Sequence, residues 1–549
     1  MSTSLLARLL SAAALVTCAA SGLGCAQFKP PLTCASQGGA PWVELSSQHF
    51  EMRTDLDRSE ARDALAEFER SYAALEDVCF PSDRSDPFRM QIILFARERD
   101  FRQFAPPSSG GFFMHALPND LEPAPTMVMY GSLGEQTRLT FQHELTHHFV
   151  AQSIGPSPAW LNEGLAQFYS TFRLQDGHAY IGSSLPDRDF LKGSFWRTAS
   201  HGPFTRVLIP VTQARSATEL IHMARDDFYG PPGHTPQVER RPVAINYLSS
   251  WALVHMLING PEPYVQRFTS FLEAASGGAP VRQALQQALR GIPPEQLDRD
   301  YRSYLMGQRL IRKVGPYTAR PPSPPRAERA MSDAEVHVLW ARLMRWEGAE
   351  RAWAAAHLEE ALAHAPNHPE VRFWRGRLRI AEARLPEAEQ ELTAALAARP
   401  ADPRYLLTMG RFLYTLASHR VITTLQAMGR AAPIVDRLGR TASTAAQLNF
   451  VAGYRLEHRE FDEAEMFVKR ALQADPSCAS CYDTYGMLLL VQGRVTEAIR
   501  AASHALDLLP EGNASPLFEA RLRCFHAHEK ASRDGAPARP ERCFNPPRQ

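Results

Sequence analysis

Two histidines and a glutamate stand at a spacing that suits a metal site. The chain reads His143-Glu144-Leu145-Thr146-His147, which is an H-E-x-x-H pattern. Residues four apart project from one face of a helix, so both imidazoles could reach one zinc ion. The carboxylate of Glu144 lies beside that face, where it could take a proton from a metal-activated water. The pattern therefore indicates hydrolysis with Glu144 as the general base.

A third metal ligand is expected from the next helix. Gly155 and the prolines that follow it end the first helix, and a second helix begins at Pro158. If the chain turns back tightly, Glu163 faces the two histidines and completes a His2Glu site with one position open for water. We therefore expect one Zn2+ per chain. The alternative is a surface helix in which the histidines are ordinary and Glu163 is solvated.

The surrounding pattern predicts the elements that hold this site. Apolar residues at 139, 141, 145 and 149 should anchor the first helix in a core. The loop 106–125 is rich in Gly and Pro and is either a flap or a plain connection. Helical spacing predicts a helix at 58–78 and a mainly helical region at 158–312. Short alternating patterns predict strands at 42–45 and 49–54. The run 89–95 is the clearest strand, and 126–130, just before the H-E-x-x-H helix, is another.

At these residues the sequence resembles the gluzincin metallopeptidases. In that family the H-E-x-x-H helix is followed by a helix with a Glu ligand, often within a W-x-N-E-G-x-A run, which stands here at 160–166. The resemblance covers roughly residues 42–312 and implies an α+β zincin-like fold. It makes His143, His147 and Glu163 the zinc ligands, and Glu144 the base. The short gap to Glu163 is similar to the compact peptidase MA-like branch. An edge strand beside the cleft would then pair with extended substrate.

A later helix offers a candidate for oxyanion stabilisation. The apolar stretch 247–257 opens on Tyr247, and in gluzincins a Tyr from a later helix often stabilises the oxyanion. The resemblance therefore makes Tyr247 a candidate catalytic residue, and the alternative is a packed tyrosine with a locally satisfied hydroxyl. His255 is expected in the core. His148 adjoins the motif but points to a different side of the helix.

The C-terminal half repeats with a period that is typical of helical solenoids. Pro366 and Pro400 are 34 residues apart, and glycines follow ten residues after the prolines of this series, at 376, 410 and 486. The period resembles tetratricopeptide repeats and implies an all-α solenoid over 331–530, degenerate around 415–445. Its concave surface would bind peptides or partner proteins, and the alternative is a rigid spacer. A Pro-rich linker, 313–330, precedes the repeats, and a polar tail, 531–549, follows them.

The residue pattern at the N-terminus predicts that the protein is exported. Residues 1–25 combine Arg8, an apolar run and small residues before Cys25, as an export signal does, and 26–41 form a short linker. The run ending in Cys25 resembles a bacterial lipobox, which implies lipidation of Cys25 and attachment to a membrane, and the alternative is ordinary cleavage nearby. We expect a periplasmic or cell-envelope protein. The formal net charge of +1 offers no footprint for nucleic acid.

The cysteines fit an oxidising compartment. If Cys18 is removed and Cys25 is lipidated, an even number of cysteines remains for disulfides. A disulfide between Cys34 and Cys79 would lie within the first domain. Cys478 and Cys481 have redox-motif spacing, but no βαβ pattern surrounds them, which favours a structural bridge over catalysis.

Together these observations predict an exported zinc metallopeptidase that hydrolyses peptide bonds, with repeats that recruit a peptide or protein substrate or a protein partner. The first domain shows no aminopeptidase-type motif, which favours an endopeptidase. The alternative is a non-catalytic scaffold lipoprotein that binds partner proteins through its repeats.

Overall fold

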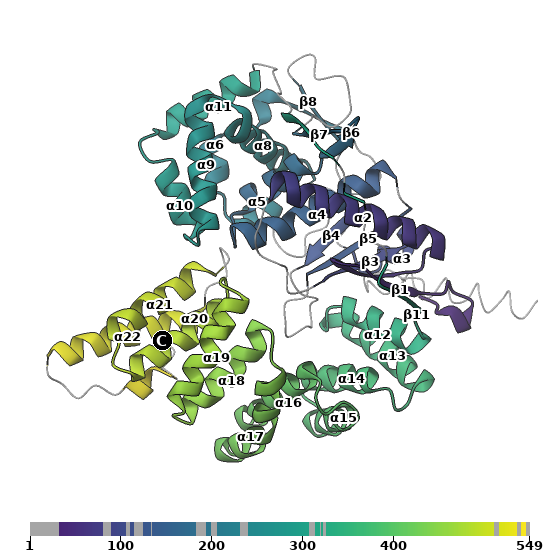
Figure 1. Ribbon diagram of the computed structural model, residues 1–549, viewed down its shortest axis with the longest axis vertical. Coiled ribbons are helices and arrows are strands. Elements are labelled where there is room, and N and C mark those ends of the chain that lie inside the picture. Colours follow the sequence, from purple (N-terminus) through teal and green to yellow (C-terminus); the bar gives the residue numbers. More distant parts are fainter. Residues whose placement is uncertain are drawn as a thin grey trace, which may run out of the picture.

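A mixed sheet with helices on both faces forms the first part of the molecule, and a helical solenoid forms the rest (Figure 1). The predicted export signal with Cys25 lies outside the described residues. The computed structural model describes residues 32–80, 89–105, 110–114, 125–132, 134–182, 194–198, 206–230, 240–306, 313–318, 320–321, 325–509, 515–534 and 540–544.

Six strands form the main sheet, in the order β11-β1-β2-β3-β5-β4. Strands β2, β3 and β5 run parallel, and the remaining neighbours pair antiparallel. The four strands expected from the sequence are confirmed as β1, β2, β3 and β5. The strands are β1 (Val43–Ser46), β2 (Phe50–Thr54), β3 (Met90–Phe95), β4 (Gly111–Met114), β5 (Thr126–Tyr130) and β11 (Ala327–Ala330).

Two long helices cover one face of this sheet. Helix α2 (Arg58–Cys79) matches the predicted helix, and the Asp57 side chain caps it by accepting the Ser59 amide N–H. Helix α4 (Glu135–Ser153) carries the H-E-x-x-H motif. Phe68 of α2 stacks on Phe141 of α4 with ring centroids 4.1 Å apart, inside the core that the sheet lines. Burial of such apolar rings is what holds the motif helix against the sheet.

The region 158–312 contains the predicted helices together with hairpins that the sequence did not indicate. Its helices are α5 (Ala159–Tyr169), α6 (Ala217–Ile221), α7 (Arg225–Tyr229), α8 (Arg240–Asn259), α9 (Glu262–Ser276), α10 (Val281–Ala288) and α11 (Pro294–Met306). Its strands are β6 (Arg173–Gln175), β7 (His178–Ile181), β8 (Ser194–Thr198) and β9 (Arg206–Pro210).

The predicted Pro-rich linker is not a free spacer. Strand β10 (Lys313–Pro316) pairs with β7, and β11 pairs with β1 at the edge of the main sheet. Arg329 of β11 lies 2.8 Å from Glu44, and Glu328 lies 2.7 Å from Arg62 of α2. Charged side chains hide the strand in the sequence, because an exposed edge strand needs no apolar face.

The second face of the sheet is covered by the start of the solenoid. Helix α12 (Asp333–Leu343) places Trp340 edge-on to Trp42, with ring centroids 6.3 Å apart, beside the short helix α3 (Glu98–Phe101). Leu32 and Cys34 belong to the same core, so the described part of the predicted N-terminal linker, with η2 (Ala35–Gln37), is also packed. The first repeat is therefore fixed on the sheet.

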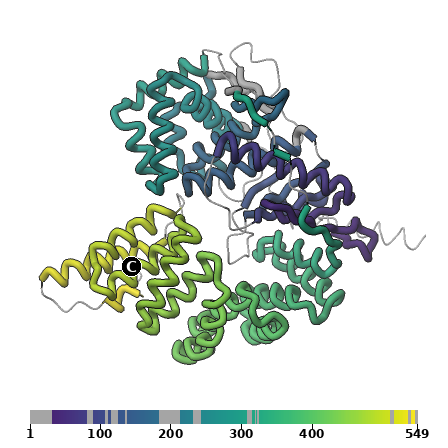
Figure 2. Tube along the Cα trace, in the orientation of Figure 1, coloured from purple at the N-terminus to yellow at the C-terminus, as the bar shows by residue number. Residues whose placement is uncertain are grey.

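The solenoid then runs as successive helix pairs in an arc below the first domain (Figures 1 and 2). A Cβ at Gly376 would lie 2.8 Å from Leu392, and one at Gly410 would lie 2.6 Å from Phe450, so these glycines admit neighbouring helices. The degenerate stretch holds α17, which contains Pro433. The helices after α12 are α13 (Gly348–His364), α14 (Pro369–Ala381), α15 (Leu385–Ala398), α16 (Pro403–Ser418), α17 (Thr424–Thr441), α18 (Ala445–Glu457), α19 (Phe461–Ala474), α20 (Ala479–Val491), α21 (Val495–Asp507) and α22 (Pro516–Arg533).

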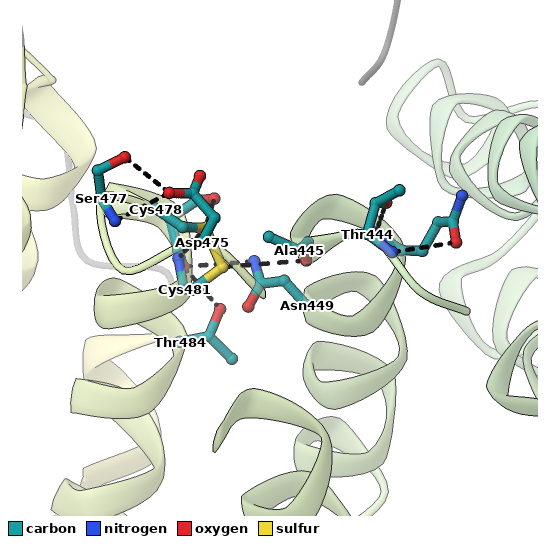
Figure 3. Close-up of a disulfide and its surroundings, with 10 residues drawn as sticks. Thr444, Ala445, Asn449, Asp475, Ser477, Cys478, Cys481 and Thr484 are labelled. Atoms are coloured by element: carbon teal, nitrogen blue, oxygen red, sulfur yellow. Dashed lines mark hydrogen bonds between the residues drawn. A yellow bond between two sulfur atoms is a disulfide. The ribbon is translucent and has the colours of Figure 1, made fainter. Parts of the chain in front are cut away.

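Two disulfides lie in the solenoid. The predicted bridge between Cys478 and Cys481 is confirmed at the start of α20, beside Ala445 and Asn449 of α18 (Figure 3). A second bridge, Cys524 to Cys543, ties η4 (Pro540–Cys543) of the predicted tail to α22.

The bridge suggested between Cys34 and Cys79 is wrong, because both residues are free cysteines. Cys34 lies in the core on the α12 side of the sheet, whereas Cys79 packs on the α2 side. The sheet itself separates the two thiols. Among the described helices, we find none with the length and apolar composition required to cross a membrane.

Gly164 is required where α5 crosses α8. An added Cβ would lie 2.6 Å from the side chain of Val254 and 2.7 Å from the carbonyl oxygen of Ser250. We expect Gly164→Ala to destabilise the protein by about 1–3 kcal/mol through overpacking. At Gly429 an added Cβ meets nothing within 4 Å, so Gly429→Ala should be neutral or stabilise by about 0.5–1 kcal/mol. Urea unfolding of both variants checks this, and equal effects would contradict it.

Candidate metal centre

Helices α4 and α5 bring the three predicted ligands together. Nε2 of His143 and Nε2 of His147 lie 3.2 Å apart, and Oε2 of Glu163 lies 3.4 Å from the first and 3.7 Å from the second. All three side chains are at least nine-tenths buried. The turn from Ile154 to Pro158, with Gly155 at φ +79°, reverses the chain so that α5 faces α4.

This triangle has the dimensions of a tetrahedral zinc site. Zinc bonds of about 2.0–2.1 Å place neighbouring ligand atoms about 3.3–3.4 Å apart. The three measured separations lie close to that value. In addition, Oε2 of Glu163 is buried and has no hydrogen-bond partner among the described residues, which is costly for a carboxylate unless a cation satisfies it. The donor set and its geometry therefore fit zinc.

The outer ring nitrogens of both histidines are held by α5. Nδ1 of His147 lies 3.1 Å from Oδ1 of Asn162, which can only accept, so Nδ1 carries the proton and Nε2 keeps its lone pair. Nδ1 of His143 lies 3.2 Å from the side-chain amide of Gln167. Contacts of this kind set the tautomer and orientation of metal-binding histidines.

Tyr229 of α7 positions the third ligand. Its hydroxyl donates to Oε1 of Glu163 at 2.8 Å, which leaves Oε2 to face the histidines. Burial alone would raise the pKa of Glu163, but the two histidines and the Tyr229 hydroxyl outweigh it and lower the pKa to about 2. The carboxylate is therefore ionised, as a metal ligand must be.

Glu144 lies beside the cluster in a different electrostatic environment. Burial raises the pKa of its carboxyl above the usual range, although the neighbouring histidines and the backbone N–H of Phe113 act in the opposite direction. Two carboxyl groups with pKa values pushed apart suit two roles, one as a charged ligand and one as a proton carrier.

The edge strand β4 runs next to these residues. Phe113 of β4 has its ring 6.4 Å from that of His147, and a Cβ at Gly111 would lie 2.6 Å from Thr140 of α4. Among the described strands, β4 is the last of the sheet, and the backbone N–H of Phe113 donates to the Glu144 carboxylate. Residues 111–114 of the predicted flap or connection therefore form the strand β4, and the other parts of that loop lie mostly outside the described residues.

Tyr247 lies next to the residue that holds Glu163. Its ring centroid is 6.3 Å from that of Tyr229, and the buried side chain lies two turns into α8, which begins at Arg240 and not at Tyr247. An oxyanion role for Tyr247 stays a prediction. His148 is buried beside Phe113, on a different side of α4 from the ligands.

His255 is a core histidine, as expected. Its Nε2 donates to the carbonyl of Gly182 at 3.2 Å, and its Nδ1 accepts from the Tyr304 hydroxyl at 2.6 Å. Both nitrogens of the neutral ring are thus satisfied. Burial is the main reason that the pKa of His255 falls to about 4, which the bond to Gly182 only partly offsets.

Sequence reasoning missed Tyr229 and Gln167. Gln167 stands four residues after Glu163, so helical spacing alone could have placed it on the same face. Tyr229 lies 66 residues from Glu163 in a five-residue helix, and no periodic pattern marks it.

Comparisons with known proteins concern the solenoid. Residues 351–411 match the family model described as tetratricopeptide repeat, which confirms the predicted repeats there. The search of curated proteins finds no match to this chain. Solved structures that are similar include PilW, a type IV pilus biogenesis factor, with 15% identity, a TM-score of 0.31 and coverage of 37% of this chain and 91% of that one. Pseudomonas aeruginosa pilF shows 17% identity, a TM-score of 0.27 and coverage of 37% and 89%.

Removing the Tyr229 hydroxyl should loosen the third ligand. We expect Tyr229→Phe to weaken Zn2+ binding about 10–100-fold, the usual loss for an outer partner of a metal ligand. Competition with a chromophoric chelator measures the affinity. Tyr264→Phe is the control, because the Tyr264 hydroxyl bonds Asp300 instead. Equal affinities for Tyr229→Phe and the wild type would contradict the positioning role.

His255 should make the fold sensitive to acid. Its pKa is about 4 in the folded protein and about 6.5 in an unfolded chain, so only the unfolded chain gains a proton between these values. Stability should therefore fall as the pH drops from 6.5 to 4, by up to about 3 kcal/mol. Unfolding measured across this window should be less pH-dependent in His255→Gln than in the wild type. An unchanged pH dependence in His255→Gln, matching that of the exposed control His419→Gln, would rule this out.

Proposed function

We propose that this protein is an exported zinc metallopeptidase whose repeats recruit a substrate or partner protein. The observation that carries the proposal is the convergence of His143, His147 and Glu163 at zinc-like separations, with Glu144 beside them. Oε2 of Glu163 faces the two histidines but accepts no hydrogen bond from the described residues, which gives a cation a reason to bind in this buried cluster.

A zinc ion at this site would supply Lewis acidity, which lowers the pKa of water and polarises a carbonyl group. Glu144 accepts the proton that the attacking water loses, and its raised pKa favours that transfer. The same carboxyl then delivers the proton to the leaving amine. Glu163 stays ionised because the Tyr229 hydroxyl donates a hydrogen bond to its Oε1. Tyr247 is the proposed donor to the oxyanion, a role that rests on the gluzincin resemblance.

The edge strand suggests how a substrate would be presented. In the gluzincin resemblance an extended substrate pairs with an edge strand beside the cleft, and β4, the last of the described strands of the sheet, is the candidate for that strand. Backbone pairing of this kind selects for exposed chain more than for sequence. Because Phe113 of β4 contacts both the His147 ring and the Glu144 carboxylate, a peptide on this edge would pass the cluster. Such binding needs no free terminus, which favours an endopeptidase.

The tetratricopeptide repeats indicate a role in protein–protein interaction. Since α12 is packed on the sheet, a protein captured by the repeats would be held at a raised effective concentration near β4 and the cluster. Two disulfides in the solenoid agree with an exported protein. Attachment of lipid at Cys25 remains part of the proposal.

The second candidate is a scaffold without catalysis. The match to tetratricopeptide repeats favours this candidate, because repeats of this kind bind partner proteins. In that case the buried cluster would serve the fold, and loss of residues 331–549 would remove partner binding while loss of Glu144 would change nothing.

Two substitutions distinguish the proposed metal ligand, Glu163, from the proposed general base, Glu144. Elemental analysis should show that Glu163→Ala loses about one zinc per chain relative to the wild type, because a His2Glu site has three protein ligands. Glu144→Gln should keep this zinc and lose about 10²–10⁴-fold in peptide hydrolysis, the usual contribution of a general base.

Glu273→Gln, at an exposed position of α9, is the control and should match the wild type in both measurements. Equal zinc content in Glu163→Ala and the wild type would refute the metal centre. A wild-type rate in Glu144→Gln would leave the scaffold as the better description.

A further inference from the structure

A second cluster of metal-binding side chains lies where the N-terminal segment meets the first repeat. Cys34 precedes η2, His337 lies on α12, and His364 is the last residue of α13. One ligand atom from each of these residues lies within 4.8 Å of those of the other two. The three positions are distant in sequence, so the fold itself assembles the group.

The three side chains of this cluster lie at different depths, from the core to the surface. Cys34 is fully buried and His337 is 2% exposed, whereas His364 is exposed at the surface. The rings of His337 and His364 are stacked, with centroids 5.9 Å apart. A cation could therefore enter from solvent on the His364 side and reach the two buried donors.

His337 carries an unsatisfied donor or acceptor in this place. Its Nε2 is buried and has no hydrogen-bond partner in the part of the chain that the structure describes, although buried ring nitrogens are nearly always bonded. Its Nδ1 lies 3.0 Å from Nδ1 of His357, so one of these two nitrogens must carry a proton. When the proton is on His337, the bond to His357 fixes the tautomer in which Nε2 offers a lone pair. That is the arrangement expected of a metal-binding histidine.

We propose that Cys34, His337 and His364 bind a zinc ion that fastens the N-terminal segment to the first repeat. A thiolate with two imidazoles suits Zn2+ and not Mg2+ or Ca2+, which prefer oxygen ligands. Tetrahedral ligand atoms around zinc lie about 3.3–3.7 Å apart, so closure needs a shift of roughly 1 Å, which the exposed His364 ring can supply. The fourth position is left to water.

The neighbourhood of Cys34 supports this assignment. Asp333, at the start of α12, accepts the Ser36 amide N–H at 3.1 Å and also a hydrogen bond from the Cys34 thiol. These bonds already align the segment with α12 before any metal binds. On zinc binding the thiol bond to hydrogen is replaced by a bond to zinc, and the released proton passes to the buffer.

Cobalt provides a readout that depends on the thiolate. Metal-free full-length protein is titrated with CoCl2, and a sulfur-to-cobalt charge-transfer band in the near ultraviolet reports binding at Cys34. We expect this band in the wild type and in Cys79→Ser, whose thiol lies on the other side of the sheet. Cys34→Ala should abolish the band. A wild-type protein without the band at excess cobalt, or a band that survives in Cys34→Ala, would overturn the proposal.

His364→Ala guards against a folding defect, because His364 is exposed. Loss of this ligand should weaken the affinity for cobalt, measured through the charge-transfer band, at least about tenfold. Loss of a residue that only bonds a metal ligand already lowers metal affinity about 10–100-fold. His419→Ala, at another exposed histidine after α16, should bind as the wild type does. Equal affinities for His364→Ala and His419→Ala would overturn the three-residue site.

The result is independent of the peptidase proposal. Glu163→Ala should keep the thiolate band while losing the His2Glu site. If Cys34→Ala retains the zinc content of the wild type and Glu163→Ala retains none, the second site fails and the proposed catalytic centre stands.

Discussion

The structure depends on the burial of a polar helix. Every residue of α4 from 141 to 150 is buried, although most of them are polar, and each polar group removed from water needs a partner. Helix α5 provides these partners along one face, with Asn162, Glu163 and Gln167 directed at the histidines of α4. Its opposite face carries Gly164, which lets α5 lie tightly between α4 and α8. The run 160–166 of α5 therefore supplies both polar partners for the histidines of α4 and the space for close packing against α8.

The same sheet also determines where the repeats begin. Its α4 side holds the candidate metal centre, and its other side is covered by α12, so the two halves of the chain share one layer of strands. Strand β11 adds to β1 immediately before α12. Cys34 and His337 meet at this junction, which gives the N-terminal segment a direct contact with the solenoid. A partner bound by the repeats would therefore keep a defined position relative to β4.

Much of this arrangement could be predicted, because a helix or strand with one buried face shows apolar residues at regular intervals in the sequence. Alternation revealed β1 and β2, strand-like runs revealed β3 and β5, helical spacing revealed α2, and an apolar stretch revealed the second half of α8. The paired motifs located Glu163 before its distances were known. The exposed strand β11 and the short hairpins carry no such period. Tyr229 comes from a distant short helix and is recognisable only by its contact with Glu163. The pairing of Cys34 with Cys79 failed because sequence counts thiols without showing the sheet between them.

Anomalous X-ray scattering at the zinc absorption edge, from crystals of zinc-loaded protein, tests the central claim most directly. We predict a strong anomalous peak between Nε2 of His143, Nε2 of His147 and Oε2 of Glu163, at about 2.0–2.2 Å from each atom. A folded protein whose crystals show no peak at that position, with the three side chains placed as they are here, would contradict a zinc centre at α4 and α5.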